Sequence, residues 1–382
     1  RSVSRGLGDV YKRQILNYIL TFSFVLFLTF MGISYIFKEE QTFSQNENRT
    51  LQTLPEFTLN NLLDGSFISD IESYINDQVL FRDEFMEFKT DIMLLAKNKD
   101  INEVYIGEDG YLLQKVLPST FNYEQLNYNL DCINEFASKV DAPVYSLLIP
   151  SSFSILQDKL PSNASSIDEL EVIKDMSSKY SEITFIDATT NLENHKKEYI
   201  YYKTDHHWTP LGAFYAYQAW HNADEKDLDS YDIKEVSTDF LGSLYSKVLN
   251  SNTAFDKIEL FYPKDQTNYE VTYNFNQKKS DTLYDFSKLK TKDQYQIFLG
   301  GNHPEITIHT SNNNNRSILL FKDSFANAFI PFLLNDYENI YIIDLRYFNK
   351  DINTYLEDKD IDEILFLYNL YNLSEDTSLR KL

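Results

Sequence analysis

The sequence predicts an α/β domain, with a parallel sheet flanked by helices and a mixed β insertion, behind one N-terminal transmembrane helix. Three observations lead to this prediction: a long uncharged run near the N-terminus, continuous apolar runs later in the chain, and helix-like stretches between those runs. The 382 residues are enough for one large α/β domain with additions, or for two smaller domains.

Residues 15–37, ILNYILTFSFVLFLTFMGISYIF, carry no charge and are long enough to cross a bilayer as a helix. The run exceeds the apolar core of a signal peptide, and no Ala-x-Ala-like cleavage site follows it, so we expect an uncleaved anchor. A buried core helix is the alternative. Residues 1–14 lack an initiator Met and apolar periodicity, and we interpret them as a non-native sequence artefact. Lys12 and Arg13, the positive charges that would satisfy the positive-inside rule, belong to that segment. We expect the N-terminus to lie inside and the bulk of the protein outside.

The formal net charge of the chain is -23. An acidic surface of this kind argues against nucleic acid as a partner and favours neutral or cationic partners. Cys132 is the only cysteine, so the chain has no internal disulfide and its fold depends on its core. Such a composition is compatible with an extracytoplasmic protein that is not held together by disulfides.

Residues 38–100 are expected to form a stalk and juxtamembrane helices. Residues 43–57 are polar and contain a proline, as linkers do, and residues 60–97 show helical periodicity. Residues 104–113 follow, and they predict two short strands around an Asp-Gly turn.

Residues 101–375 are expected to form the α/β domain, and residues 376–382 a tail. Most of its apolar runs are continuous rather than alternating, as in strands that are covered on both faces. Helix-like stretches such as residues 123–139 and 326–334 lie between runs, which favours a parallel sheet. The predicted strands are residues 144–149, 183–186, 317–321, 340–343 and 364–368.

An insertion of about residues 231–315 departs from this alternation. We expect it to be a mixed β insertion or an antiparallel extension of the sheet. Its strand-like pieces are residues 257–262, 269–275, 295–298 and 305–309.

Ser324 directly follows the predicted strand SILLFKD and precedes a helix-like stretch. In open parallel sheets, sites form outside the carboxyl ends of strands, where helix N-termini offer free N–H groups to an oxyanion. A serine hydroxyl becomes a good nucleophile when an imidazole takes its proton and a carboxylate orients the imidazole. A helix cap is the alternative role for a serine in this place.

The segment Thr204-Asp205-His206-His207-Trp208-Thr209-Pro210 contains a suitable imidazole and carboxylate. In an extended segment Asp205 and His207 face the same way, so both reach one partner, and Pro210 then begins a helix. A metal site at Asp205, His206 and His207 is one alternative, but the spacing of the other histidines is not that of ligands. A structural role is another, with His206 bonded to backbone and His207 stacked on Trp208. The segment alone leaves these interpretations open.

The TDHHW segment, the later KDSFANAFIPFL, and the following IYIIDLRYF and DEILFLYNLYNL resemble the DHHW family of bacterial anchored proteins. Those proteins are similar to the alginate O-acetyltransferases, whose Asp-x-His-Trp segment and later Asp-Ser motif form a Ser-His-Asp triad on a permuted SGNH-hydrolase fold. The resemblance extends from about residue 43 to near residue 373. It implies an SGNH-hydrolase-like, flavodoxin-like sheet in this chain.

Carried over by position, the resemblance implies that Ser324 is the nucleophile, His207 the general base and Asp205 its orienting carboxylate. Asp323 would shape the turn before the serine. Gly301 and Asn302 are candidate oxyanion donors, although a simple turn is the alternative for that Gly-Gly-Asn run.

Three further residues are candidates for binding substrate. Trp208 offers a ring that stacks on sugars, and Arg346 and Tyr347 follow the fourth predicted strand. An ordinary surface pair is the alternative for the last two. We expect neither a metal nor a cofactor.

Together these features predict a membrane-anchored, extracytoplasmic O-acyl(acetyl)transferase. It would act on hydroxyls of a cell-envelope polysaccharide or exopolysaccharide through an acyl-serine. The resemblance implies a membrane-bound O-acyltransferase as the partner that supplies the acyl group. A carbohydrate esterase and a non-catalytic envelope or polysaccharide-binding protein are the alternatives.

Overall fold

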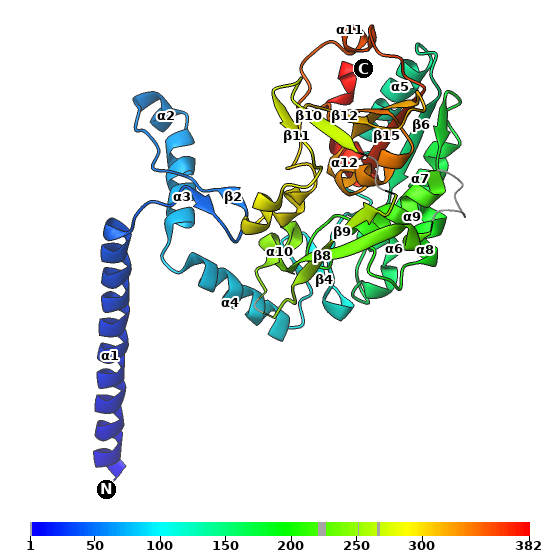
Figure 1. Ribbon diagram of the computed structural model, residues 1–382. Coiled ribbons are helices and arrows are strands. Elements are labelled where there is room, and N and C mark those ends of the chain that lie inside the picture. The colour runs from blue at the N-terminus through cyan, green and yellow to red at the C-terminus, as the bar shows by residue number, and fades with distance from the viewer. Residues whose placement is uncertain (1, 221–226, 251, 266–267) are drawn as a thin grey trace. The chain divides into compact units, whose positions relative to one another are not determined.

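The computed structural model describes residues 2–220, 227–250, 252–265 and 268–382 (Figure 1). The chain forms two compact units, Arg1–Lys89 and Thr90–Leu382. All the site residues predicted from the sequence lie in the second unit. The finer domain boundaries expected at residues 15, 38, 101 and 376 remain predictions.

The first unit begins with the long helix α1, Ser2–Phe37 (Figure 1). Its part Val10–Tyr35 is long and apolar enough to cross a membrane, and it covers most of the run expected to do so. Tyr35 donates a hydrogen bond to the carbonyl oxygen of Tyr74 over 3.2 Å, which joins the end of α1 to α3 (Ser66–Gln78).

The helical periodicity expected in residues 60–97 is confirmed, because three helices follow the linker. The helices are α2 (Leu59–Leu63), α3 (Ser66–Gln78) and α4 (Arg82–Leu95). Gly65 and Phe81, which separate them, have φ of 84° and 58°, in the left-handed region that residues of a right-handed helix do not adopt, so the helical path is interrupted at both points. A short ladder of β1 (Phe43–Ser44) and β2 (Arg49–Thr50) lies in the expected linker.

The turn predicted within residues 104–113 is also confirmed. The second unit opens with an antiparallel sheet of β3 (Asp100–Ile101), β4 (Val104–Ile106) and β5 (Leu112–Gln114). Between the last two strands Asp109 and Gly110 have φ of 54° and 82°, which Asp and Gly tolerate better than most residues.

The main sheet has the strand order β11-β10-β12-β14-β13-β15-β6-β7. All five strands predicted for the parallel sheet are confirmed, and they pair with one another in parallel. They are β6 (Val144–Ile149), β7 (Ile183–Phe185), β13 (Ser317–Lys322), β14 (Asn339–Ile343) and β15 (Glu363–Asn369). Strand β13 lies between β14 and β15, so the chain that leaves β13 goes first to one side and then to the other.

Three strands of the region about 231–315 extend this sheet in antiparallel fashion. They are β10 (Tyr269–Tyr273), β11 (Lys278–Ser280) and β12 (Glu305–Thr310). Strands β8 (Tyr231–Phe240) and β9 (Asp256–Pro263) form a separate ladder. The strand expected at residues 295–298 is wrong: Gln294–Ile297 is a short 3-10 helix, η5. The chain reverses directly after it, where Leu299, Gly300 and Gly301 all have positive φ.

Helices cover both faces of the parallel sheet. Phe136 of α5 (Tyr123–Ala137) packs edge-on against Phe321 and Phe366, with ring centroids 5.6 and 6.0 Å apart. Trp220 of α9 (Pro210–Trp220) packs 4.7 Å from Tyr145, which pairs with Leu365 beside Phe366. Because neighbouring residues of a strand face opposite ways, α5 and α9 lie on opposite faces.

The remaining helices are short and lie in the connections. They are α6 (Ser152–Ile155), α7 (Glu169–Ser177), α8 (Thr189–Asn194), α10 (Ser243–Val248), α11 (Ile352–Leu356) and α12 (Leu370–Glu375), with the 3-10 helices η1 (Glu108–Gly110), η2 (Gln157–Lys159), η3 (Leu228–Ser230), η4 (Phe286–Lys290) and η8 (Leu379–Lys381).

The helix expected at residues 326–334 is wrong in type. Two 3-10 helices occupy this segment, η6 (Ser324–Ala328) and η7 (Ile330–Asn335). Pro331 has no N–H to donate, so a continuous α-helical ladder cannot pass through it. Ser324 therefore begins a short 3-10 helix.

Candidate active site

Ser324 lies just beyond the carboxyl end of β13, between the ends of β14 and β15. The preceding residue, Asp323, is buried and accepts hydrogen bonds from the backbone N–H groups of Phe325 and Asn369, both over 2.9 Å, and from the Asn372 amide over 2.8 Å. Burial raises the pKa of Asp323 against the opposing charge of Arg346. These contacts tie the turn that carries Ser324 to the end of β15, as the sequence predicted for Asp323.

Asp205 and His207 lie in a tight loop between α8 and α9. An isolated β-bridge between Tyr201 and Trp208 closes the loop, and the Tyr202 N–H donates to the His207 carbonyl oxygen over 3.2 Å. Residues 203–207 form bends, so the prediction that this segment is extended is wrong. The two side chains meet because Asp205 accepts the backbone N–H of His207 over 3.0 Å, a local turn that Asp favours.

His207 links the carboxylate to the serine. Its Nδ1 lies 2.5 Å from Asp205 Oδ1, and its Nε2 lies 2.8 Å from Ser324 Oγ. An ionised carboxylate only accepts hydrogen bonds, so Nδ1 carries the hydrogen and the Nε2 lone pair faces the serine hydroxyl. Asp205 and His207 are buried, whereas Ser324 is partly exposed. The arrangement has the geometry of a serine nucleophile with its base.

The electrostatics of Asp205 suit this arrangement. Burial raises its pKa, but electrostatic interactions with His206 and His207 and hydrogen bonds from His207 and Ser243 outweigh burial and hold the pKa below its usual range. The Ser243 backbone N–H donates to Asp205 Oδ2 over 2.8 Å. Asp205 therefore stays ionised at neutral pH, as an orienting carboxylate must.

A second buried carboxylate holds the residues before Asp205. Asp256 accepts the backbone N–H and hydroxyl of Thr204 over 2.7 and 2.6 Å, and the backbone N–H of Lys203 over 2.9 Å. The Thr204 hydroxyl in turn accepts the N–H of Gly242 over 2.9 Å. The loop is thus fixed from β9 and from the start of α10.

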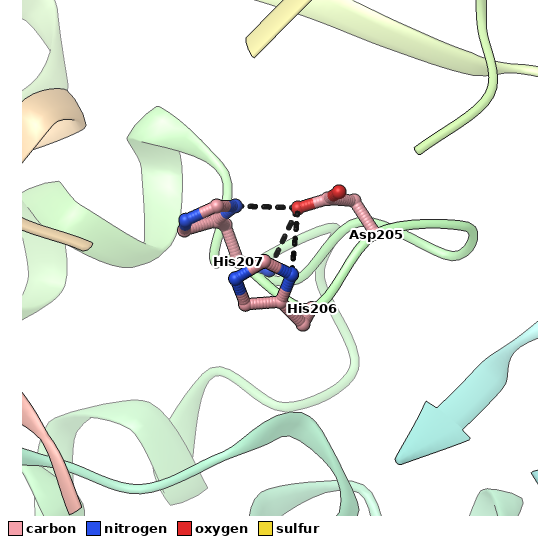
Figure 2. A group of neighbouring side chains, drawn as sticks. All are labelled: Asp205, His206 and His207. Atoms are coloured by element: carbon pink, nitrogen blue, oxygen red, sulfur yellow. Dashed lines mark hydrogen bonds and ion pairs between the residues drawn. The ribbon is translucent and has the colours of Figure 1, made fainter. Parts of the chain in front are cut away.

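His206 has surroundings that differ from those of His207. Its Nδ1 lies 2.6 Å from Ser243 Oγ and 3.7 Å from Asp205 Oδ1. Figure 2 shows both imidazoles turned toward one oxygen of Asp205. Ligand atoms of Asp205, His206 and His207 lie within 4.8 Å of one another, the proximity that the metal interpretation requires. However, each Nδ1 and the His207 Nε2 already has a hydrogen-bond partner within the protein.

Tyr295 of η5 stacks on His207, with centroids 3.8 Å apart and an interplanar angle of 8°. Its hydroxyl donates to the carbonyl oxygen of Ser324 over 3.0 Å. The sequence does not single out Tyr295, one of 28 tyrosines. Nor does it single out Asp256 or Ser243, which come from other segments. The one weak indication that Gly242 has a special role is the scarcity of glycine in the chain.

The expectation that Trp208 forms a sugar-stacking wall is wrong. Trp208 has no exposed surface, and its Nε1–H donates to the Phe325 carbonyl oxygen over 2.8 Å. Its ring also packs parallel to that of Phe329. Trp208 therefore packs against the turn that carries Ser324.

Arg346 and Tyr347 follow β14, and both have exposed surface. Arg346 donates from Nε and Nη2 to the two oxygens of Asp344, over 2.8 and 2.6 Å, and its side chain is 33% exposed. In the parallel pairing of Phe321 with Ile343, these residues follow β14 at the edge where Ser324 follows β13. Their roles in binding substrate remain predictions.

The Gly-Gly-Asn run forms a turn, which was the alternative to its role as an oxyanion donor. Gly300 and Gly301 have φ of 74° and 110°, and the Gly301 N–H donates to the Phe298 carbonyl oxygen over 3.2 Å, so that N–H is not free for an oxyanion. Asn302 contacts the end of β13, the strand that leads to Ser324. Its Oδ1 accepts from Lys322 Nζ over 3.1 Å. Lys322 is fully buried, which lowers its pKa to about 8.

The family model of the DHHW protein matches residues 119–343, which is more than half of the chain and includes Asp205, His207 and Ser324. The chain belongs to the DHHW family. This confirms the family that the sequence motifs predicted. A comparison with the curated proteins found no match.

Solved structures of similar fold include one that is described as a DHHW family protein. A DHHW family protein from Eubacterium siraeum shares 27% identity with a TM-score of 0.62, covering 72% of this chain and 92% of that chain. Bacillus cereus PatB1 shares 26% identity with a TM-score of 0.59, covering 70% and 96%. The O-acetyltransferase domain of Pseudomonas putida AlgJ matches at 12% identity and a TM-score of 0.45, covering 73% and 95%. That last likeness is too distant to support an argument about this chain.

Proposed function

We propose that this DHHW protein is a membrane-anchored O-acyltransferase that transfers an acyl group, such as acetyl, to hydroxyls of a cell-envelope polysaccharide or exopolysaccharide. The observation that carries the proposal is the link from Asp205 through His207 to the partly exposed Ser324, over 2.5 and 2.8 Å. The mixed sheet, with the serine at the end of β13, supports an SGNH-like fold, which is part of the proposal.

In the first half-reaction Ser324 Oγ attacks the acyl carbonyl carbon while its proton passes to His207 Nε2. The tetrahedral intermediate collapses when the donor alcohol leaves with that proton, and the acyl group stays on Ser324. In the second, a sugar hydroxyl gives its proton to His207 and attacks the ester, which returns Ser324 to its free form. Asp205 stabilises the imidazolium in both halves without taking its proton. No cofactor is required.

Water in place of the sugar hydroxyl would make the same chain an esterase. The partial exposure of Ser324 is compatible with either acceptor. The two reactions differ only in where the acyl group ends, so the product distinguishes them.

The N-terminal helix and the chemistry of the donor complete the proposal. A transferase outside the membrane needs an acyl group delivered across the bilayer, and we propose a membrane-bound O-acyltransferase as the partner that delivers it. The helix α1 would anchor the chain beside such a partner, with the second unit on the outer side. Arg346 and Tyr347 would contact the substrate beside Ser324.

The test follows the fate of a labelled acetyl group. The full chain in detergent, given a ¹⁴C-acetyl ester and a de-O-acetylated envelope polysaccharide, should move label into the polysaccharide, and Ser324→Ala should abolish the movement. Release of all the label as acetate would establish the esterase instead. No consumption of ester beyond that of Ser324→Ala would contradict both enzymes and leave the non-catalytic alternative.

A further inference from the structure

The imidazole of His207 is enclosed between two other rings. Tyr295 lies on it at 3.8 Å and 8°, and His206 lies on it at 3.8 Å and 37°. Two rings this close to a third would overlap if they shared a face, so they occupy opposite faces. Asp205 fixes the imidazole within its plane, and the two rings restrict its rotation out of that plane.

Tyr295 also contacts the nucleophile's own residue. Its hydroxyl donates to the Ser324 carbonyl oxygen over 3.0 Å. Burial holds the pKa of Tyr295 well above its usual range, so the hydroxyl keeps its proton at every working pH. One side chain therefore touches both the base and the backbone of the serine.

We propose that Tyr295 is a positioning residue that sets the alignment of the His207 imidazole with the Ser324 hydroxyl. This inference rests on the proposed acyl transfer. Proton transfer from Ser324 needs the imidazole held at a defined distance and angle, and small misplacements of reacting groups cost large factors in rate. The face of an aromatic ring also attracts positive charge, so Tyr295 favours the imidazolium that forms as the serine attacks.

Tyr295 differs from residues that contact substrate. Its side chain is only 3% exposed, so it offers little surface to a sugar or an acyl donor. Loss of the ring should therefore lower kcat far more than it changes KM. Loss of the hydroxyl alone should have the smaller effect, because the stacking ring remains.

An ordinary core tyrosine is the alternative role, because Tyr295 also packs on Phe298 with centroids 5.2 Å apart. Tyr284 supplies a matched control. It too is buried, packs on Phe298 at 6.1 Å, and donates its hydroxyl to a backbone carbonyl oxygen, that of Phe261, over 3.0 Å. The partners through which Tyr295 acts, His207 and Ser324, are not among those contacts.

The experiment compares Tyr295→Phe, Tyr295→Leu, Tyr284→Phe and Tyr284→Leu in the full chain in detergent, with 4-nitrophenyl acetate as substrate. We expect Tyr295→Leu to lower kcat about 10- to 100-fold with little change in KM. Tyr295→Phe should lower kcat by less than about 10-fold, the effect of losing one hydrogen bond. Tyr284→Leu should lose comparable thermal stability and keep its kcat. An equal loss of kcat in both leucine variants, or an unchanged kcat in Tyr295→Leu, would overturn the inference.

A second readout separates this inference from the proposed function. Phenylmethylsulfonyl fluoride forms an S–O bond to an activated serine as fluoride leaves and the serine proton passes to the base, and intact-mass spectrometry follows that reaction without an acyl substrate. Slow labelling of Ser324 in Tyr295→Leu, beside normal labelling in Tyr284→Leu, supports positioning even where no acyl transfer occurs. Equal labelling in both variants overturns it, and an unlabelled, inactive parent overturns the proposed function together with the inference.

Discussion

Gly242 lies so close to Asp205 that a Cβ atom added to Gly242 would stand 2.3 Å from the Cβ of Asp205. It would also stand 2.5 Å from Oδ2, the oxygen that accepts the Ser243 N–H. Real Cβ atoms do not approach other heavy atoms so closely, so a larger residue there must displace the carboxylate that orients His207. Lack of a side chain at residue 242 is therefore a requirement of the candidate site.

Gly242→Ala should lower kcat about 10- to 100-fold, because a shift of Asp205 misaligns the imidazole. Turnover of 4-nitrophenyl acetate measures this. Overpacking should also destabilise the fold by about 1–3 kcal/mol, as measured by thermal unfolding.

Gly107→Ala provides the control for that destabilisation. Gly107 and Gly242 both precede helices, with φ of -82° and -83°. A Cβ at Gly107 would stand 2.5 Å from the Lys159 carbonyl oxygen and would not contact Asp205. Gly107→Ala should lose stability without the same loss of kcat, and equal losses of kcat in the two variants would show that the steric argument at Asp205 is wrong.

Ser324 and His207 should act as a unit. Ser324→Ala, His207→Ala and the double variant should each lower ester turnover by a similar large factor, about 10⁶-fold, because either loss removes the activated nucleophile. Additive losses, with the double variant far slower than either single variant, would mean that the two residues act independently. His309→Ala serves as the control, since His309 is exposed and bonds to Asn339 at the start of β14, the end opposite to that where Ser324 follows β13.

Asp205→Asn should keep the fold but lower kcat about 10⁴-fold, because an amide can hold the imidazole in the wrong tautomer. Steady-state kinetics with 4-nitrophenyl acetate measure the effect. Activity within a few fold of the parent would remove Asp205 from the proposed mechanism.

Trp208→Phe should affect stability rather than recognition of sugars. The substitution removes the Nε1–H that donates to Phe325 and leaves a buried carbonyl oxygen without that donor. We expect a loss of about 1–3 kcal/mol in unfolding free energy, measured by chemical denaturation. An unchanged KM for the polysaccharide acceptor agrees with a supporting role, whereas a raised KM without loss of stability would restore the sugar-stacking role.

Glu169 predicts a pH dependence of stability. This carboxyl is fully buried and accepts the Ser151 N–H over 2.6 Å and the hydroxyls of Ser151 and Ser154 over 3.1 and 3.0 Å. Burial, opposed by those hydrogen bonds, raises its pKa from 4.5 to about 7. The folded chain therefore binds the proton more tightly than the unfolded chain does.

The contribution of protonated Glu169 should be complete below pH 4.5 and be lost as the pH rises through about 7. The loss amounts to roughly 3 kcal/mol, measured as the unfolding free energy at pH 5 and pH 8. Glu169→Gln has no titrating proton, so its stability should vary less over this range. Parallel pH profiles for parent and variant would contradict the shift.

The parallel sheet could be predicted because strands covered on both faces are continuous apolar runs, as in residues 317–321. Short 3-10 helices lack such a pattern, so residues 295–298 and 326–334 were assigned the wrong type. Asp205, His207 and Ser324 could be found because a polar motif at the end of an apolar strand is unusual, and because the motifs resemble one family.

The rest of the site could not be predicted, because it depends on contacts between distant segments. Tyr295 and Gly242 meet His207 and Asp205 only after folding, and the residues around them carry no local signal. The sequence does not distinguish a sugar-binding Trp208 from a core Trp208, because an indole ring suits either role, and only its burial in the fold separates the two.

The central claim is that Ser324 becomes acylated with the help of His207. Intact-mass spectrometry of the full chain in detergent, stopped with acid shortly after 4-nitrophenyl acetate is added, tests it most directly. The account predicts one added acetyl group, located on Ser324 by peptide mapping, and its absence in Ser324→Ala and His207→Ala. An acetyl group that forms equally fast in Ser324→Ala, or a folded parent that neither gains acetyl nor turns over the ester, would contradict it.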